Sequence, residues 1–424
     1  MPPLEPFPTV RSAGPPPTVS PPPADPSTAF VLKLGRALAR AGYPTHRLED
    51  ALTDVSTQLQ LRGQFFVTPT SIFASFGPDE RQHTHLIRVE PGSTDLGATA
   101  SVEEIGRRVA YGQLDPAKGI AELDALETAP PPYPAWLSLL AFVVSSACAA
   151  RILGGAMREI VGAGVVGALV GVVSLASRGA PALARVTGAA TAFVAAFALA
   201  GATRLALPMS TTIAELAGLI ALLPGLPLVV AMAELVALHL VSGTSRFVGA
   251  VMTLVGLVFG VALGSAAGGI VFRGPPLTRT PVPPVGWTVG IALAFAPAAF
   301  LVLMRGRARH LPMVFVASLA GYYGGRLGVW MFGPELGIVM GSLSVGVMAN
   351  LLSRWTGTSA GVTVPPALLL LVPGSIGFRG LALMLDNRVL DGVQTAFRMV
   401  IMLSALVAGL FAAATLAPPP RRWG

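Results

Sequence analysis

The stretch Leu222-Leu223-Pro224-Gly225 interrupts one long apolar run, and Leu371-Val372-Pro373-Gly374 interrupts a second. The first run extends from Thr211 to Val241, about 31 residues or roughly 46 Å as a straight helix, whereas the hydrocarbon core of a bilayer is only ~30 Å thick. Proline removes a backbone donor, and glycine admits non-helical dihedral angles. Each Pro-Gly pair therefore predicts a helix break inside a lipid bilayer.

The composition of the chain as a whole is that of a membrane protein. Of its 424 residues, 53% are hydrophobic and only 12% are charged, and nearly all long apolar runs follow Pro134. Residues 1–135 have a net charge of −4 (11 − 15), and residues 136–424 have a net charge of +12 (18 − 6). The arginines of the second part are scattered through short loops, which is typical of topology signals and not of a nucleic-acid surface. Nucleic acid is therefore not an expected partner.

Ten membrane spans are expected after Pro134, most of them close to the length that a bilayer requires. They are Trp136–Leu153, Ile160–Ala176, Val186–Leu207, the run from Thr211, Phe247–Phe272, Trp287–Met304, Leu311–Phe332, Leu336–Leu352, the run from Thr363, and Met399–Leu416. Glycine and alanine are abundant inside them, which allows close packing between helices.

The spacing of the two breaks indicates an internal repeat. Pro224 and Pro373 are 149 residues apart (373 − 224 = 149), and Gly243 and Gly392 have the same separation. Each half then holds five spans, and an odd number forces the second half to enter the membrane from the opposite side. The predicted fold is an all-α polytopic membrane protein with a 5+5 inverted repeat, an arrangement that is common among transporters.

The segment before the membrane part predicts a small soluble α+β domain. Residues 28–62 place apolar side chains at the spacing of two helices, with Gly42 ending the first and Thr45 capping the second. Later elements are expected to be three short strands at residues 65–68, 71–76 and 83–89, then helices from Ser101 and from Pro116.

The expected organisation of the whole chain has seven parts. They are a disordered Pro-rich tail (1–27), the soluble domain (28–128), a linker (129–135), the first five-helix repeat (136–272), a second linker (273–285), the second repeat (286–417) and a short tail (418–424). The single cysteine, Cys148, excludes a disulfide within one chain.

The breaks also predict where a small polar solute binds. Hydrocarbon offers no partner for the backbone groups freed at a break, so protein, water or solute must satisfy them. The candidate binding residues are those of the breaks and nearby hydroxyl and amide groups, namely Pro224, Gly225, Pro373, Gly374, Ser375, Asn350, Thr211 and Thr212.

Ionisable groups inside a membrane are costly and are functional candidates by default. Glu215, ahead of the first break, and Arg326, within the seventh expected span, are the candidates for proton coupling. Glu234, His239 and Arg388 follow the breaks and are interpreted as residues of the membrane interface.

Two other functions stay open at this point. A membrane-tethered hydrolase would use the soluble domain, where His46 and Asp50 lie four residues apart. Further hydroxyl and imidazole groups come from Thr68, Thr70, Ser71, His83 and His85. However, the sequence has no nucleophile elbow, HExxH motif or P-loop, so no catalytic residue, cofactor or metal site is expected. A membrane pore or scaffold, with the soluble domain as a partner-binding lid, is the third hypothesis.

The chain resembles the bacterial threonine/serine exporter (ThrE-like) family along most of residues 28–417. The motifs that carry the resemblance are Leu34-Gly35-Arg36-Ala37-Leu38, Gly42-Tyr43-Pro44-Thr45-His46-Arg47-Leu48-Glu49, Phe66-Val67-Thr68-Pro69-Thr70, Arg88-Val89-Glu90-Pro91-Gly92, Leu223-Pro224-Gly225-Leu226-Pro227, Leu240-Val241-Ser242-Gly243, Met348-Ala349-Asn350-Leu351-Leu352 and Leu371-Val372-Pro373-Gly374-Ser375. The chain departs from the family at Glu234, where aspartate is common, and at His239, where a Gly-Asp pair is typical.

The resemblance implies an exporter of threonine and serine in the bacterial cytoplasmic membrane, driven by the proton gradient. It also implies ten spans and a cytoplasmic N-terminal domain. With the N-terminus inside, loop arginines such as Arg246, Arg305 and Arg307 face the cytoplasm. A homo-oligomer is compatible with the sequence.

Overall fold

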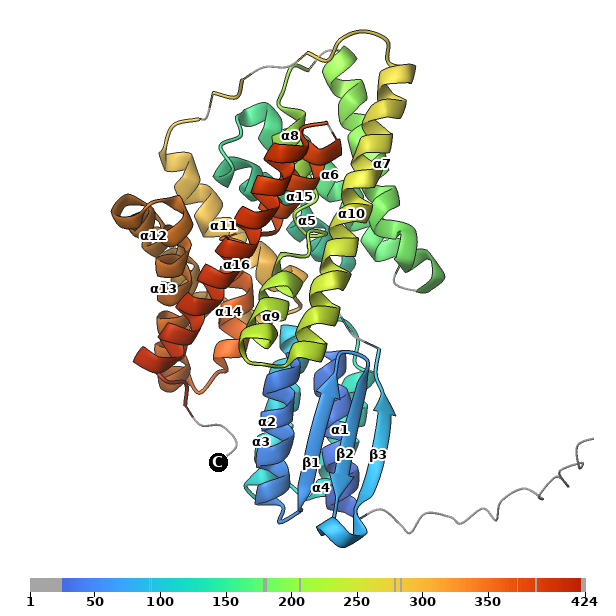
Figure 1. Ribbon diagram of the computed structural model, residues 1–424, viewed down its shortest axis with the longest axis vertical. Coiled ribbons are helices and arrows are strands. Elements are labelled where there is room, and N and C mark those ends of the chain that lie inside the picture. Colours follow the sequence, from blue (N-terminus) through green and yellow to red (C-terminus); the bar gives the residue numbers. More distant parts are fainter. Residues whose placement is uncertain are drawn as a thin grey trace, which may run out of the picture.

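The structure is a computed structural model that describes residues 25–420 apart from residues 91, 93, 178–180, 206, 278, 279, 283, 372 and 386. The described chain forms a small unit with a sheet, residues 26–127, and a larger bundle of helices above it in the view of Figure 1. Most of the tail expected over residues 1–27 lies outside the described residues.

The N-terminal unit packs helices on one face of a three-stranded antiparallel sheet of order β1-β2-β3. Phe73 of β2 pairs with Phe66 of β1 and with Leu86 of β3. Apolar side chains such as Phe30, Leu34 and Leu52 are fully buried between helices and sheet. The elements are α1 (Pro26–Arg40), α2 (Thr45–Gln58), β1 (Gly63–Thr68), β2 (Ser71–Phe76), β3 (His83–Arg88), α3 (Leu96–Ala110) and α4 (Pro116–Glu127).

Two details of this unit differ from the sequence prediction. Thr45 is the first residue of α2 and not its cap, because Pro44 occupies the cap position and the Thr45 hydroxyl bonds to Glu234 of the helical bundle. Helix α3 begins at Leu96, earlier than the predicted Ser101, because the Asp95 side chain accepts a hydrogen bond from Ala98 N and so caps the helix. Gly42 follows the end of α1 in the left-handed region (φ +80°), as the predicted helix end requires.

The bundle consists of the helices after residue 134. They are α5 (Ala135–Ile152), α6 (Met157–Ala176), α7 (Pro181–Leu205), α8 (Thr211–Gly218), α9 (Gly225–Val236), α10 (Leu240–Val271), α11 (Trp287–Leu303), α12 (Leu311–Phe332), α13 (Pro334–Thr356), α14 (Ala360–Leu369), α15 (Pro373–Leu385) and α16 (Val389–Leu416). Among the described residues, seven helical segments are long and apolar enough to cross a membrane, one of them being α14 and α15 taken together. Helices α9 and α11 are apolar but shorter.

The two predicted helix breaks are confirmed. Helix α8 ends at Gly218 and α9 begins at Gly225, while α14 ends at Leu369 and α15 begins at Pro373. Each break is followed by a non-glycine residue with positive φ.

These two residues, Leu238 (φ 65°) and Asn387 (φ 59°), lie 149 residues apart like the breaks themselves. Gly243 and Gly392 pack against Leu235 and Met384, which have the same separation. The same local structure therefore occurs twice at one spacing.

Small residues bring α7 and α10 into close contact. A Cβ on Gly260 would lie 2.2 Å from the carbonyl oxygen of Ala189, and one on Gly264 would lie 2.2 Å from that of Phe193. Without a Cβ, the two backbones approach as closely as helices in membranes do when glycine lines their interface.

The substitution Gly264→Ala is expected to lower the melting temperature of the detergent-purified protein by several degrees. The new methyl group would force the helices apart, and overpacking of this kind costs ~1–3 kcal/mol. Gly256→Ala is the matched control in the same helix, because its Cβ would meet no atom within 4 Å. Thermal unfolding measures both variants, and equal melting temperatures would contradict the close contact.

Candidate functional site

The two helix breaks meet each other. A Cβ placed on Gly374 would lie 3.1 Å from Cα and 3.2 Å from the backbone nitrogen of Gly225. The cavity beside this contact has a volume of about 10 Å³, which is room for about one water molecule. Its lining is apolar and comes from both halves of the bundle: Ile220, Leu223, Gly225, Leu226, Val229, Leu368, Leu369 and Gly374. In this structure the two breaks therefore touch, and the space beside them is too small for an amino acid; this arrangement is called the closed contact below.

The Gly225 amide, which was expected to be open, already has a partner in this closed arrangement. Its N–H donates to the carbonyl oxygen of Leu223 at 2.8 Å, across a tight turn at Pro224 (φ −78°, ψ 45°). This turn is close to the inverse γ-turn, in which one residue separates donor and acceptor. A solute that used this amide would have to open the turn.

The other predicted binding residues do not gather at the contact. Ser375 directly follows Gly374 and is buried. Thr211 and Thr212 begin α8, at the end of that helix opposite the break. Asn350 lies on α13 and donates from Nδ2 to the carbonyl oxygen of Ala417 at 2.8 Å, so it ties α13 to the end of α16.

The two proton-coupling candidates occupy different surroundings. Glu215 is only 9% exposed on α8, which packs against α5 and α6. Arg326 is exposed on α12, and its Nη1 lies 3.4 Å from the Tyr322 hydroxyl. Of the two candidates, Glu215 is therefore the buried one.

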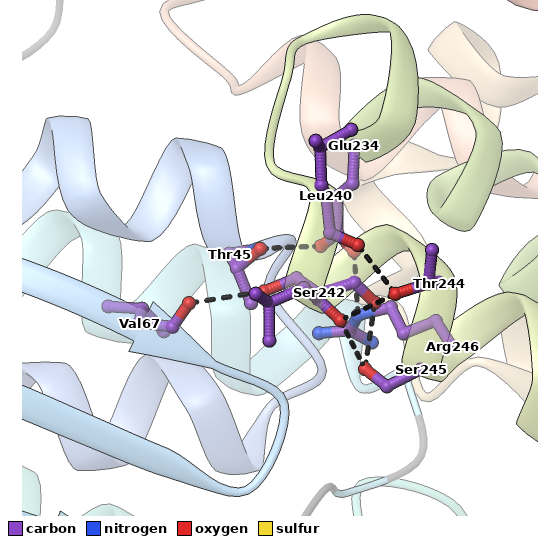
Figure 2. Close-up of polar contacts among 9 residues, drawn as sticks. Thr45, Val67, Glu234, Leu240, Ser242, Thr244, Ser245 and Arg246 are labelled. Atoms are coloured by element: carbon purple, nitrogen blue, oxygen red, sulfur yellow. Dashed lines mark hydrogen bonds and ion pairs between the residues drawn. The ribbon is translucent and has the colours of Figure 1, made fainter.

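A second polar cluster lies between the N-terminal unit and the bundle (Figure 2). Glu234, in the last turn of α9, is fully buried, with 0% of its surface exposed. Its Oε1 accepts hydrogen bonds from the backbone N and the hydroxyl of Thr45 at 2.9 and 2.8 Å. Its Oε2 lies 3.2 Å from Nε of Arg246 on α10. Glu234 therefore lies buried where the N-terminal unit meets the bundle, and not as an exposed charge.

Further contacts surround this cluster. The Ser242 hydroxyl donates to the carbonyl oxygen of Val67 at 3.1 Å, as Figure 2 shows, and the Val67 N–H donates to Glu49 Oε1 at 2.7 Å. His239 Nδ1 lies 3.6 Å from Glu49 Oε2. The α2–β1 region is thus bound to the turn between α9 and α10 by charged and neutral contacts together.

His46, the residue on which a hydrolase would depend, faces the same interface. Its ring lies 6.0 Å from that of His239. Burial, together with the charges of Arg47, His239 and Arg246, lowers the pKa of His46 to about 4, so the ring is neutral at pH 7. The hydroxyls of Thr68 and Ser71 bond to each other at 2.7 Å.

The N-terminal unit also contacts the loop after α11. Leu96 N donates to the Met304 carbonyl oxygen at 2.9 Å, and Arg305 Nη1 lies 3.2 Å from Asp95 Oδ2. Arg307 Nη2 donates to the Ser101 hydroxyl at 2.8 Å. The N-terminal unit therefore contacts both halves of the bundle. It contacts Glu234 in the first half and Arg305, which follows α11, in the second.

Comparisons with known proteins identify a family. The family ThrE, described as "Putative threonine/serine exporter", matches residues 29–267, and the family ThrE_2, described as "Threonine/Serine exporter, ThrE", matches residues 290–416. An uncharacterized protein of Schizosaccharomyces pombe is 27% identical over 369 residues, which cover 83% of this chain and 48% of that protein. The pheromone-regulated membrane protein 10 of Pichia sorbitophila is 26% identical over 380 residues, covering 87% of this chain and 37% of its own length.

The protein of the same name from Saccharomyces cerevisiae is 27% identical over 382 residues, covering 87% of this chain and 48% of its own length. The chain thus spans about half or less of the curated relatives it matches. No solved structure matches it. The first family model alone covers more than half of the residues. The chain therefore belongs to the threonine/serine exporter family.

Proposed function

We propose that this chain is a secondary transporter that exports threonine and serine across the cytoplasmic membrane, driven by the proton gradient. The observation that carries the proposal is the contact between Gly225 and Gly374, where two interrupted helices meet backbone to backbone. Transporters often bind their substrates where broken helices of two repeats meet, because helix ends and unwound backbone supply polar groups at mid-membrane. A small zwitterion with a hydroxyl group fits that chemistry.

The proposal includes ten spans arranged as a 5+5 inverted repeat, with α8–α9 and α14–α15 each counted as one broken span. The positive-φ residues at matching positions support it, as does the exchange of contacts in which α9 packs on α16 and α15 packs on α10. In Figure 1, α10 runs away from the N-terminal unit and α16 runs toward it. Two equivalent helices with opposite directions are what an inverted repeat requires.

The proposed transport cycle opens the closed contact. A cavity of about 10 Å³ holds no amino acid, so the two halves must separate at Gly225 and Gly374 before substrate enters. The backbone of Pro224 and Pro373 and the Ser375 hydroxyl then lie nearest to the opening. Glu215, buried on the helix that leads into the first break, carries the coupled proton in this proposal.

The proposed location of the N-terminal domain, residues 28–128, is the cytoplasmic side of a bacterial cytoplasmic membrane. Arg246, Arg305 and Arg307 contact that domain or its docking cluster. Positively charged residues of short loops are retained on the cytoplasmic side, and this supports the orientation. Residues 129–135 link the domain to the two repeats, 136–272 and 286–417.

Purified protein in sealed vesicles tests the proposal. An imposed proton gradient is expected to drive labelled threonine or serine across the membrane, and unlabelled substrate on the far side should accelerate the exchange. That acceleration distinguishes a carrier from a pore. Absence of flux for every small amino acid, with the protein correctly inserted, would refute the proposed function.

A further inference from the structure

Helix α9 connects the break contact to the N-terminal domain. Its first residue, Gly225, lies against Gly374, and its last turn carries Glu234. Its 12 residues make a rod ~18 Å long. A short helix moves as one rigid body. The position of Gly225 at the break therefore depends on the contacts that hold the opposite end of α9, near Glu234.

Glu234 holds that end through two hydrogen bonds from Thr45 of the domain and an ion pair with Arg246. A buried carboxylate costs free energy unless it is paired and hydrogen-bonded, and Glu234 has both kinds of partner, Thr45 and Arg246. Thr45 is the first residue of α2, where the helix dipole favours a negative charge and backbone N–H groups lack partners. Glu234 therefore caps a helix of the soluble domain from within the bundle.

The second half of the bundle has no such anchor at the matching place. Leu383 stands 149 residues after Glu234, and the nearby ion pair between Arg388 and Asp391 is exposed. The second broken span also contacts the domain, but through a carboxylate of the domain: the hydroxyl of Ser359, the residue that caps α14, donates to the buried Glu103 Oε1 of α3 at 3.3 Å. The domain thus contacts both broken spans, and at the first of them the bundle itself supplies the buried carboxylate, Glu234.

We propose that Glu234 is a positioning residue for transport: by capping α2 it fixes α9, and it thereby couples the soluble domain to the break at Pro224-Gly225. The effect on flux rests on the proposed function, whereas the mechanical coupling does not. The charged and titratable groups around the anchor are His46, Arg47, Glu49, Asp50, His239 and Arg246.

Hydrogen exchange on the full-length protein in lipid tests the coupling without transport. Thr45→Val keeps the shape and the backbone N–H but removes the hydroxyl donor to Glu234. Amides of residues 45–48 and also of residues 222–229 are expected to exchange about tenfold faster, as for the loss of one buried hydrogen bond. Thr45→Ser, which keeps the donor, should restore the slow exchange, and Asp391→Asn should change exchange only near its own position.

Flux measurements give the second readout. Glu234→Gln keeps the size and an acceptor oxygen but removes the charge, and its maximal rate is expected to fall about tenfold with KM for threonine unchanged, because the substrate site itself is intact. If exchange at residues 222–229 is the same in Thr45→Val and wild type, Glu234 is a local cap and the proposal is wrong. Wild-type protein without flux would refute the proposed function, while the exchange experiment still decides the coupling.

Discussion

Gly374→Ala is expected to reduce the maximal transport rate about tenfold, whereas Gly225→Ala is expected to leave it within about twofold. The reason is the asymmetry of the contact between the two residues. A methyl group on Gly374 would lie 3.1 Å from the Gly225 Cα, closer than backbone normally tolerates, but one on Gly225 would lie 3.6 Å from the Gly374 nitrogen, an ordinary contact. A penalty of ~1.4 kcal/mol on the closed state corresponds to the tenfold change.

Both variants replace glycine by alanine at or next to the start of a helix, so they share the same intrinsic effect on helix stability. Initial rates of threonine flux in vesicles, normalised to inserted protein, provide the measurement. Similar losses in the two variants, or a larger loss in Gly225→Ala, would show that the closed contact is not a state of the transport cycle.

The helix breaks could be predicted from the sequence because their cause is local. Proline lacks a backbone donor whatever its surroundings, so Pro224 and Pro373 interrupt their helices in any fold. The same holds for the left-handed Gly42 after α1 and for the alternating β1–β3 pattern. Patterns of this kind depend on a few neighbouring residues, which the sequence shows directly.

The number of long apolar helices could not be predicted from local pattern, because neighbouring helices in a bundle can bury a helix that is short or interrupted. The expected span from Thr211 is two helices, α8 and α9, and α11 has only 17 residues. A broken or short helix can be buried by its neighbours instead of by lipid. The seven long apolar segments are therefore fewer than the ten expected spans.

The functional residues were harder to predict where they depend on tertiary contacts. Asn350 lies on α13, and its amide binds the Ala417 carbonyl instead of lying at the break. Glu234 is fully buried, and its Oε1 accepts hydrogen bonds from Thr45 of the soluble domain. One signal was available: an ionisable residue inside the apolar helix α9 demands a partner, but the sequence does not show that the partner is Thr45.

The central claim is that the closed contact between the two breaks opens to admit substrate, and site-directed labelling tests it most directly. Cys148 is the only cysteine in the chain, so Cys148→Ala gives a background without thiols. Val229 lines the small cavity and is 4% exposed, which makes Val229→Cys inaccessible in the closed state. Val345→Cys is the matched control, because Val345 is fully buried but lies outside the cavity lining.

In membranes, a small water-soluble thiol reagent is expected to label Val229→Cys slowly, and saturating threonine or serine should suppress most of that labelling. Val345→Cys should stay unlabelled with or without substrate. If Val229→Cys is never labelled, or if threonine and serine leave its labelling rate unchanged, the contact between the broken helices is not the substrate site.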